Sequence, residues 1–157
     1  MKSDAIYAII KDMIVTIDTN VIFQGLYSNV GASYQLLRLL KDGRIKLALS
    51  VPVFMEYCDV LKRQSTLEKT GLNATQINAV LDFIAFTGLE HRISFLYRPN
   101  LEDESDNKFI ELALASQSSY LITANIKHFT ANHELSLFEV KVVTPGEFIT
   151  LWRMKNE

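Results

Sequence analysis

Acidic and amide side chains follow several apolar segments of this chain, and their types suit one kind of chemistry. They are Asp18, Asn20, Glu56, Asp103, Asp106 and Asn125. Carboxylates that are crowded together repel one another strongly unless a cation neutralises them or a proton is shared. Oxygen ligands without His or Cys suit Mg²⁺ or Mn²⁺. If the fold brings these side chains together, the sequence predicts a divalent-metal site.

Each of these acids also has a purely structural interpretation. Asp18 could cap the turn after a strand, as Asp often does. Glu56 could be an ordinary exposed residue of a helix. Asp103 and Asp106 could complement the positive end of a helix dipole, which favours acids in the first turn. The combination of all four favours the metal site over these separate interpretations.

The elements that must position these residues alternate between strand and helix. Strands are predicted at residues 13–17, 45–49, 93–97, 120–123 and 140–144, and helices at 31–41, 50–63, from 73 onward, through 109–114 and at 145–154. This alternation predicts an α/β fold, a three-layer α/β/α sandwich with a central, mainly parallel sheet. In such a sheet Asp18, Asn125 and the start of the helix that carries Glu56 converge at one edge, where open sheets bind ligands.

Two further segments carry local signals. The polar stretch 64–71 predicts a loop. Asn73, with Gln76 three residues later, resembles a capping box that opens a helix. Four apolar residues follow at the spacing of one helix face, namely Ile77, Val80, Leu81 and Ile84.

Length and composition restrict the class of protein. The 157 residues suit a single domain over residues 1–157, with a core from about residue 13 to 148. No apolar run reaches the roughly 20 residues that cross a bilayer, and residues 1–12 do not read as a signal peptide. Cys58 is the only cysteine, so no disulfide framework is expected. A cytoplasmic protein that does not contact a membrane is therefore expected. The formal net charge of −2 argues against a polyanion binder that works through bulk positive charge.

Four ordered motifs resemble those of PIN-domain proteins, and in particular the prokaryotic branch described as toxin components of toxin–antitoxin pairs. They read Ile-Asp-Thr-Asn-Val at 17–21, Ser-Val-Pro-Val-Phe-Met-Glu-Tyr at 50–57, Asp-Glu-Ser-Asp-Asn-Lys-Phe at 103–109, and Tyr-Leu-Ile-Thr-Ala-Asn-Ile-Lys-His-Phe at 120–129. The resemblance implies a divalent-metal-dependent endoribonuclease that uses Mg²⁺ or Mn²⁺. It also implies products with 5′-phosphate and 3′-hydroxyl ends, a homodimer and a cognate antitoxin protein as a partner.

The resemblance assigns roles to individual positions. Asp18, Glu56 and Asp106 match the catalytic acidic metal ligands, and Asp103 matches a further acid beside them. The residues that match pocket-shaping positions are Asn20, Thr123 and Asn125. Asn125 falls where many members of the family carry another Asp, and this departure removes one charged ligand.

Of two alternatives, the first stays open and the second is disfavoured by the sequence. The first is a PIN-like module that binds RNA or a protein without cutting, which Asn125 and the weak basic charge motivate. The second is a phosphatase that forms an aspartyl-phosphate, which would also place an Asp after its first strand. That chemistry commonly needs a second Asp two residues later, where this chain has Asn20. The chain carries neither a Gly-x-x-x-x-Gly-Lys-Ser/Thr nor a Gly-x-Gly-x-x-Gly motif, so a nucleotide-binding enzyme has no support.

Overall fold

A five-stranded sheet lies at the centre of the molecule. The computed structural model describes residues 13–93, 107–130, 135 and 138–156. The strands are β1 (Ile14–Ile17), β2 (Lys46–Leu49), β3 (Leu89–Glu90), β4 (Tyr120–Ile122) and β5 (Lys141–Val143). Their order is β3-β2-β1-β4-β5, and every neighbouring pair is parallel. The predicted α/β fold with a parallel sheet is confirmed.

Strand β1 is the central strand, and its sequence explains why. Val15 and Ile17 are fully buried, and Val15 pairs with Leu47 of β2 on one side and Tyr120 of β4 on the other. β-Branched side chains on both faces suit a strand that is covered on both sides. The chain builds outward from β1 through β2 to β3, and then continues on the other side of β1 with β4 and β5. The strand order therefore reverses between β1 and β4, the point where open α/β sheets bind ligands.

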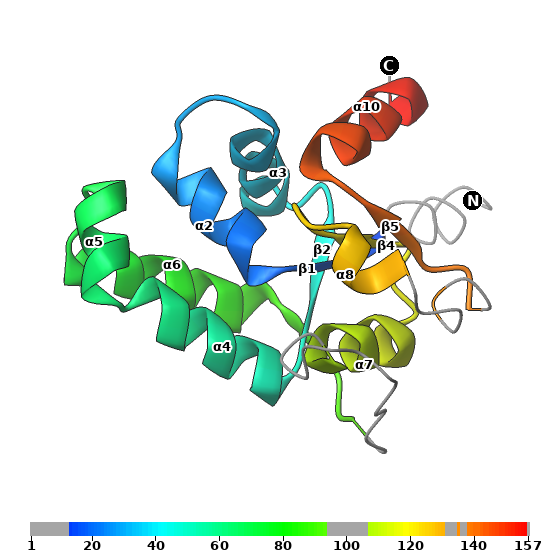
Figure 1. Cartoon of the computed structure of the whole chain (residues 1–157), viewed down its shortest axis with the longest axis horizontal. Coiled ribbons are helices and arrows are strands. Elements are labelled where there is room, and N and C mark those ends of the chain that lie inside the picture. The colour runs from blue at the N-terminus through cyan, green and yellow to red at the C-terminus, as the bar shows by residue number, and fades with distance from the viewer. Residues whose placement is uncertain (1–12, 94–106, 131–134, 136–137, 157) are drawn as a thin grey trace, which may run out of the picture.

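Helices cover both faces of this sheet (Figure 1). Their bounds are α2 (Thr19–Tyr27), α3 (Ala32–Lys41), α4 (Val51–Leu61), α5 (Gln64–Thr70), α6 (Ala74–Thr87), α7 (Asn107–Ser116), α8 (Lys127–Thr130) and α10 (Pro145–Asn156). Helices α3 and α10 contact each other on one side, whereas α6 and α7 pack on the sheet and contact α4 on the other. Within the described part of the chain, no helix combines the length and the apolar character that a membrane crossing requires.

Helix α2 starts at the residue after Asp18, where the sequence indicated no helix. It packs closely against α3 because Gly25 has no side chain. A Cβ at this position would lie 2.4 Å from Leu37 Cδ1 and 2.9 Å from the Ser33 carbonyl oxygen. Both distances are too short for a real contact, so the glycine sets the separation of the two helices.

The predicted capping box opens α6. Asn73 Oδ1 accepts from the Gln76 backbone N–H at 2.8 Å, and the Asn73 N–H donates to Gln76 Oε1 at 2.9 Å. Ile77, Leu81 and Ile84 are buried along the predicted face. The prediction of this helix from its capping signal and its periodicity is confirmed.

Two local predictions need comment. The loop predicted at 64–71 is wrong, because Gln64–Thr70 forms α5 and ends at Gly71 in the left-handed conformation (φ 73°). Only Thr66 of this helix is buried, so its apolar periodicity is too weak to read. The strand predicted at 93–97 lies outside the described residues except for Ile93, which is not in a strand. The sheet edge beside β2 is instead formed by the two residues of β3.

Candidate functional site

Asp18 lies at the carboxyl end of β1, where the strand order reverses. Its side chain is only 7 % exposed, and it accepts a hydrogen bond of 2.8 Å from Thr123 Oγ1. Although Asp18 stands at the N-cap position of α2, its side chain makes no capping hydrogen bond. The carboxylate thus joins the ends of β1 and β4 and does not serve as a helix cap.

The surroundings of Asp18 disfavour its charged form. Burial raises the pKa of the carboxyl group and is the largest effect. The hydrogen bond from Thr123 lowers the pKa, the charge of Glu56 raises it, and the Thr19 backbone N–H and the charge of His128 lower it less. The net result is a raised pKa. A divalent cation beside Asp18 would reverse this balance, because a bound cation favours the ionised carboxylate.

Thr123 is fully buried just after β4 and fixes the direction of a short hydrogen-bond chain. The Asn125 backbone N–H donates to Thr123 Oγ1 at 3.0 Å. The single hydroxyl proton of Thr123 is then directed to Asp18 Oδ2. The backbone after β4 therefore orients Thr123, and Thr123 in turn holds the carboxylate.

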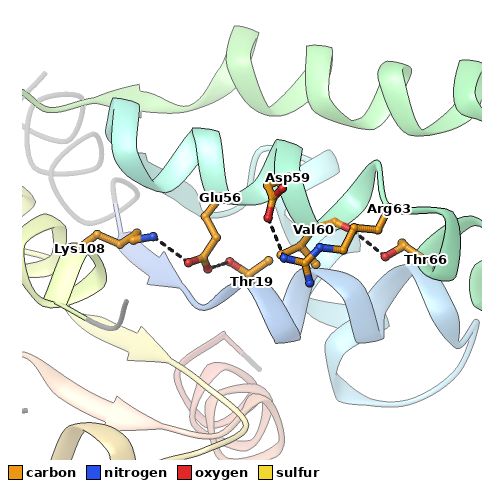
Figure 2. Close-up of polar contacts among 7 residues, drawn as sticks. All are labelled: Thr19, Glu56, Asp59, Val60, Arg63, Thr66 and Lys108. Carbon is orange, nitrogen blue, oxygen red and sulfur yellow. Dashed lines mark hydrogen bonds and ion pairs between the residues drawn. The ribbon is translucent and has the colours of Figure 1, made fainter. Parts of the chain in front are cut away.

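Glu56 reaches the same edge from the second turn of α4. This helix starts after Ser50, whose hydroxyl accepts from the Val53 N–H at 3.4 Å, and Pro52 occupies its first turn. Figure 2 shows Glu56 between two donors from other helices. Thr19 Oγ1 donates to one carboxylate oxygen, and Lys108 Nζ pairs with the other at 2.9 Å. Both oxygens of Glu56 thus have a partner.

Tyr57, the next residue along, ties α4 to the end of β1. It is fully buried, and its hydroxyl donates to the Ile17 carbonyl oxygen at 2.5 Å. Burial raises the pKa of Tyr57 well above its usual range, and the charges of Asp18 and Glu56 raise it further. The phenol therefore stays protonated and acts as a donor that positions the residue preceding Asp18.

The other predicted site residues lie at different places. Asn20 is exposed in the first turn of α2, and Asn125 is exposed with its Nδ2 2.9 Å from His128 Nε2. Asp103 and Asp106 lie outside the described residues. Of the predicted acids, Asp18 and Glu56 are therefore the two whose surroundings the structure describes.

Sequence reasoning missed Thr19 and Lys108, which contact Glu56, and Tyr57, which donates to the carbonyl oxygen of Ile17 before Asp18. All three stand inside the motifs that carry the family resemblance, within two residues of a residue that was selected. Lys108 also follows an acid-rich segment as its first cation. A search for cations and donors adjacent to candidate ligands would have found it.

The donor set suits a hard divalent cation. Asp18 and Glu56 offer carboxylate oxygens, and at the start of α7 the almost fully buried Asn107 Oδ1 has no hydrogen-bond partner within the described residues. The same residues contain no group of three or more His, Cys, Asp or Glu side chains that could hold a metal ion. Mg²⁺ usually keeps several waters and takes only one or two protein carboxylates. The oxygen atoms at this edge are therefore of the kind that a divalent cation prefers.

Comparison with known proteins adds one match. The PIN domain family model matches residues 14–127, from the first residue of β1 to the first residue of α8. A search of curated proteins found no match. PIN domains are generally nucleases, and they typically use divalent metals. Because the match covers well over half of the sequence and includes the whole Asp18 edge, the chain belongs to the PIN-domain family.

Proposed function

We propose that this protein is a divalent-metal-dependent endoribonuclease whose reaction centre lies around Asp18 and Glu56. The observation that carries the proposal is the environment of Asp18, a buried carboxyl group at the reversal point of the sheet with a hydroxyl as its side-chain partner. A buried carboxylate without a cation is costly, and a site that binds a metal gains from that cost. Family membership supports the nuclease class.

In this proposal Asp18 and Glu56 hold Mg²⁺ or Mn²⁺, and Asp103 and Asp106 join them on the strength of the family resemblance. A bound divalent ion would lower the pKa of a water molecule and offset charge on the phosphate. The chain itself orients the ligands, because Thr123 directs its proton to Asp18 and Thr19 directs its proton to Glu56. Asn20 and Asn125 stand exposed near this edge, where they can shape the approach of RNA.

The test is cleavage of labelled single-stranded and structured RNAs with Mn²⁺, with Mg²⁺ and with chelator. Asp18→Asn keeps the shape of the side chain and removes its charge, so cleavage should fall by more than about 100-fold. The matched control is Asp59→Asn, which removes an exposed carboxylate about one turn further along α4. Cleavage that survives in Asp18→Asn, or that persists in chelator, contradicts the proposal.

A second function, RNA or protein binding without cleavage, has one observation in its favour. Asn125 stands where, by the family resemblance, many members carry an acid. Metal binding that disappears in Asp18→Asn, with RNA bound but uncut under every condition, would favour this function. Replacing Asn125 by Asp would then be expected to create cleavage.

We also propose that the chain acts as the toxin of a toxin–antitoxin pair and forms a homodimer, with the family resemblance as the only support. Co-purification with the product of a neighbouring reading frame tests the first point. A chain that is harmless when expressed alone would contradict it. Sedimentation equilibrium tests the second.

A further inference from the structure

Lys108 forms an ion pair with Glu56, one of the two acids of the proposed metal centre. Its Nζ lies 2.9 Å from Glu56 Oε1, and the two side chains are 27 % and 19 % exposed. The other carboxylate oxygen of Glu56 accepts from Thr19. A divalent ion at Oε1 would therefore be a second cation beside this oxygen.

Charge disfavours the sharing of this oxygen between Lys108 and a divalent ion. A Mg²⁺ ion lies about 2.1 Å from a ligand oxygen, so an ammonium 2.9 Å from the same atom would sit within roughly 5 Å of the ion. Two cations that close repel strongly in a partly buried site. The lysine, on a flexible four-carbon side chain, is the partner that can move.

The place to which Lys108 can move is set by α7. Lys108 is the second residue of this helix, so its backbone is fixed while its ammonium can turn. The anion that arrives at a metal-loaded nuclease centre is an RNA phosphate, and a Lys ammonium binds phosphate well. Resting on the proposed function, we propose that Lys108 is a substrate-positioning residue that neutralises Glu56 in the metal-free protein and pairs with an RNA phosphate once a divalent ion takes Glu56.

This exchange makes two predictions that a structural ion pair does not make. Removing the ammonium takes away the competitor of the metal, so Lys108→Met should bind Mn²⁺ more tightly, by about fivefold. With Mn²⁺ bound, the same variant should bind RNA more weakly than the wild-type protein does, because one phosphate contact is lost. For single-stranded RNA the slope of log affinity against log salt should shrink by about 0.7.

The experiment titrates Mn²⁺ into the wild-type protein, Lys108→Met, Lys108→Gln and Asp18→Asn without RNA, by electron paramagnetic resonance. The salt dependence of binding to an uncleavable 2′-O-methyl RNA is then measured with Mn²⁺ present. Lys108→Gln retains an N–H donor for Glu56 and serves if the Met variant does not fold. Arg63→Met is the control, because it breaks the other ion pair of α4.

The outcomes separate the two proposals. Tighter Mn²⁺ binding and a smaller salt slope in the Lys108 variants support the exchange. Mn²⁺ binding that depends on Asp18 but is unchanged in the Lys108 variants, or an unchanged salt slope, overturns the role of Lys108 alone. A wild-type protein that binds no Mn²⁺ overturns both this role and the proposed function.

Discussion

Two ion pairs that start from helix α4 have different surroundings, and Figure 2 shows both. Glu56, in the middle of the helix, pairs with Lys108 of α7, 52 positions later in the sequence, with side chains 19 % and 27 % exposed. Asp59 pairs with Arg63, just past the end of α4, with side chains 67 % and 57 % exposed. One pair joins two helices at the sheet edge, and the other links neighbouring turns on the exposed surface. The difference teaches that the effect of an ion pair on function and stability depends on which elements it joins.

The largest expected effect is on cleavage. Glu56→Gln should reduce divalent-dependent RNA cleavage by more than about 100-fold, because it removes a charged ligand from the proposed centre. Asp59→Asn makes the same chemical change about one turn away and should leave the rate within about twofold, because this carboxylate is exposed and bonded to Arg63. Equal losses of cleavage in both variants would show that the loss in Glu56→Gln is not specific to the proposed centre.

The next effect is on stability, and it compares two hydroxyls that donate to backbone carbonyls. Tyr57→Phe removes the bond to Ile17 O and should cost about 1–3 kcal/mol, because that carbonyl loses its phenol donor inside the core. Thr66→Val removes the bond to Val60 O, which still accepts from the Arg63 N–H. Its cost should be smaller, and urea denaturation measures both. A larger loss of unfolding free energy for Thr66→Val than for Tyr57→Phe would contradict this ranking of the two hydrogen bonds.

A gain in stability is expected at Asp18. In chelator, Asp18→Asn should raise the Tm at neutral pH by roughly 2–4 °C, which is about 1 kcal/mol for a chain of this size. The variant removes a buried charge and can still accept from Thr123 through its amide oxygen. With saturating Mn²⁺ the wild-type protein should have the higher Tm, because the ion stabilises only the protein that binds it.

The pH dependence of this gain follows from the raised pKa of Asp18. Below the ordinary value of 3.8, Asp18 holds its proton in both the folded and the unfolded chain, so the two proteins should differ little. As the pH rises, the unfolded chain loses this proton first. The wild-type free energy of unfolding then falls relative to that of the variant, until the pH passes the raised folded pKa. If the difference in unfolding free energy between Asp18→Asn and the wild-type protein grew as the pH fell, the raised pKa of Asp18 would be contradicted.

The sequence allowed prediction of the elements that have strong patterns. Strand β1 has a β-branched run, α6 has a capping box and an apolar face, and both appear as expected. Helix α5 was missed because its residues are mostly polar, and β3 because two residues carry no period. Local patterns thus predicted the elements with a strong apolar or capping signal and failed where that signal is weak, whatever the length of the element.

The candidate site was predictable only in part, for a related reason. The edge that holds Asp18 follows from strand alternation, because parallel strands end on the same side. The contacts that orient the acids join residues far apart in the sequence, such as Thr123 with Asp18 and Lys108 with Glu56. Sequence spacing does not fix such pairs. The roles of Asp103 and Asp106 stay predictions.

The smallest expected effect is at the exposed end of α4. Arg63→Met should change the free energy of unfolding by less than about 0.5 kcal/mol, because its pair with Asp59 is open to water and screened by salt. Lys108→Met should cost more in chelator, since it leaves a half-buried Glu56 with Thr19 as its remaining partner. Urea denaturation at low and high salt checks both variants, and the Arg63 effect should vanish at high salt.

Because a bound ion can replace the lysine beside Glu56, saturating Mn²⁺ should reduce the loss of stability in Lys108→Met and leave that of Arg63→Met unchanged. Equal losses of unfolding free energy in both variants, unchanged by Mn²⁺, would mean that both ion pairs have only a structural role.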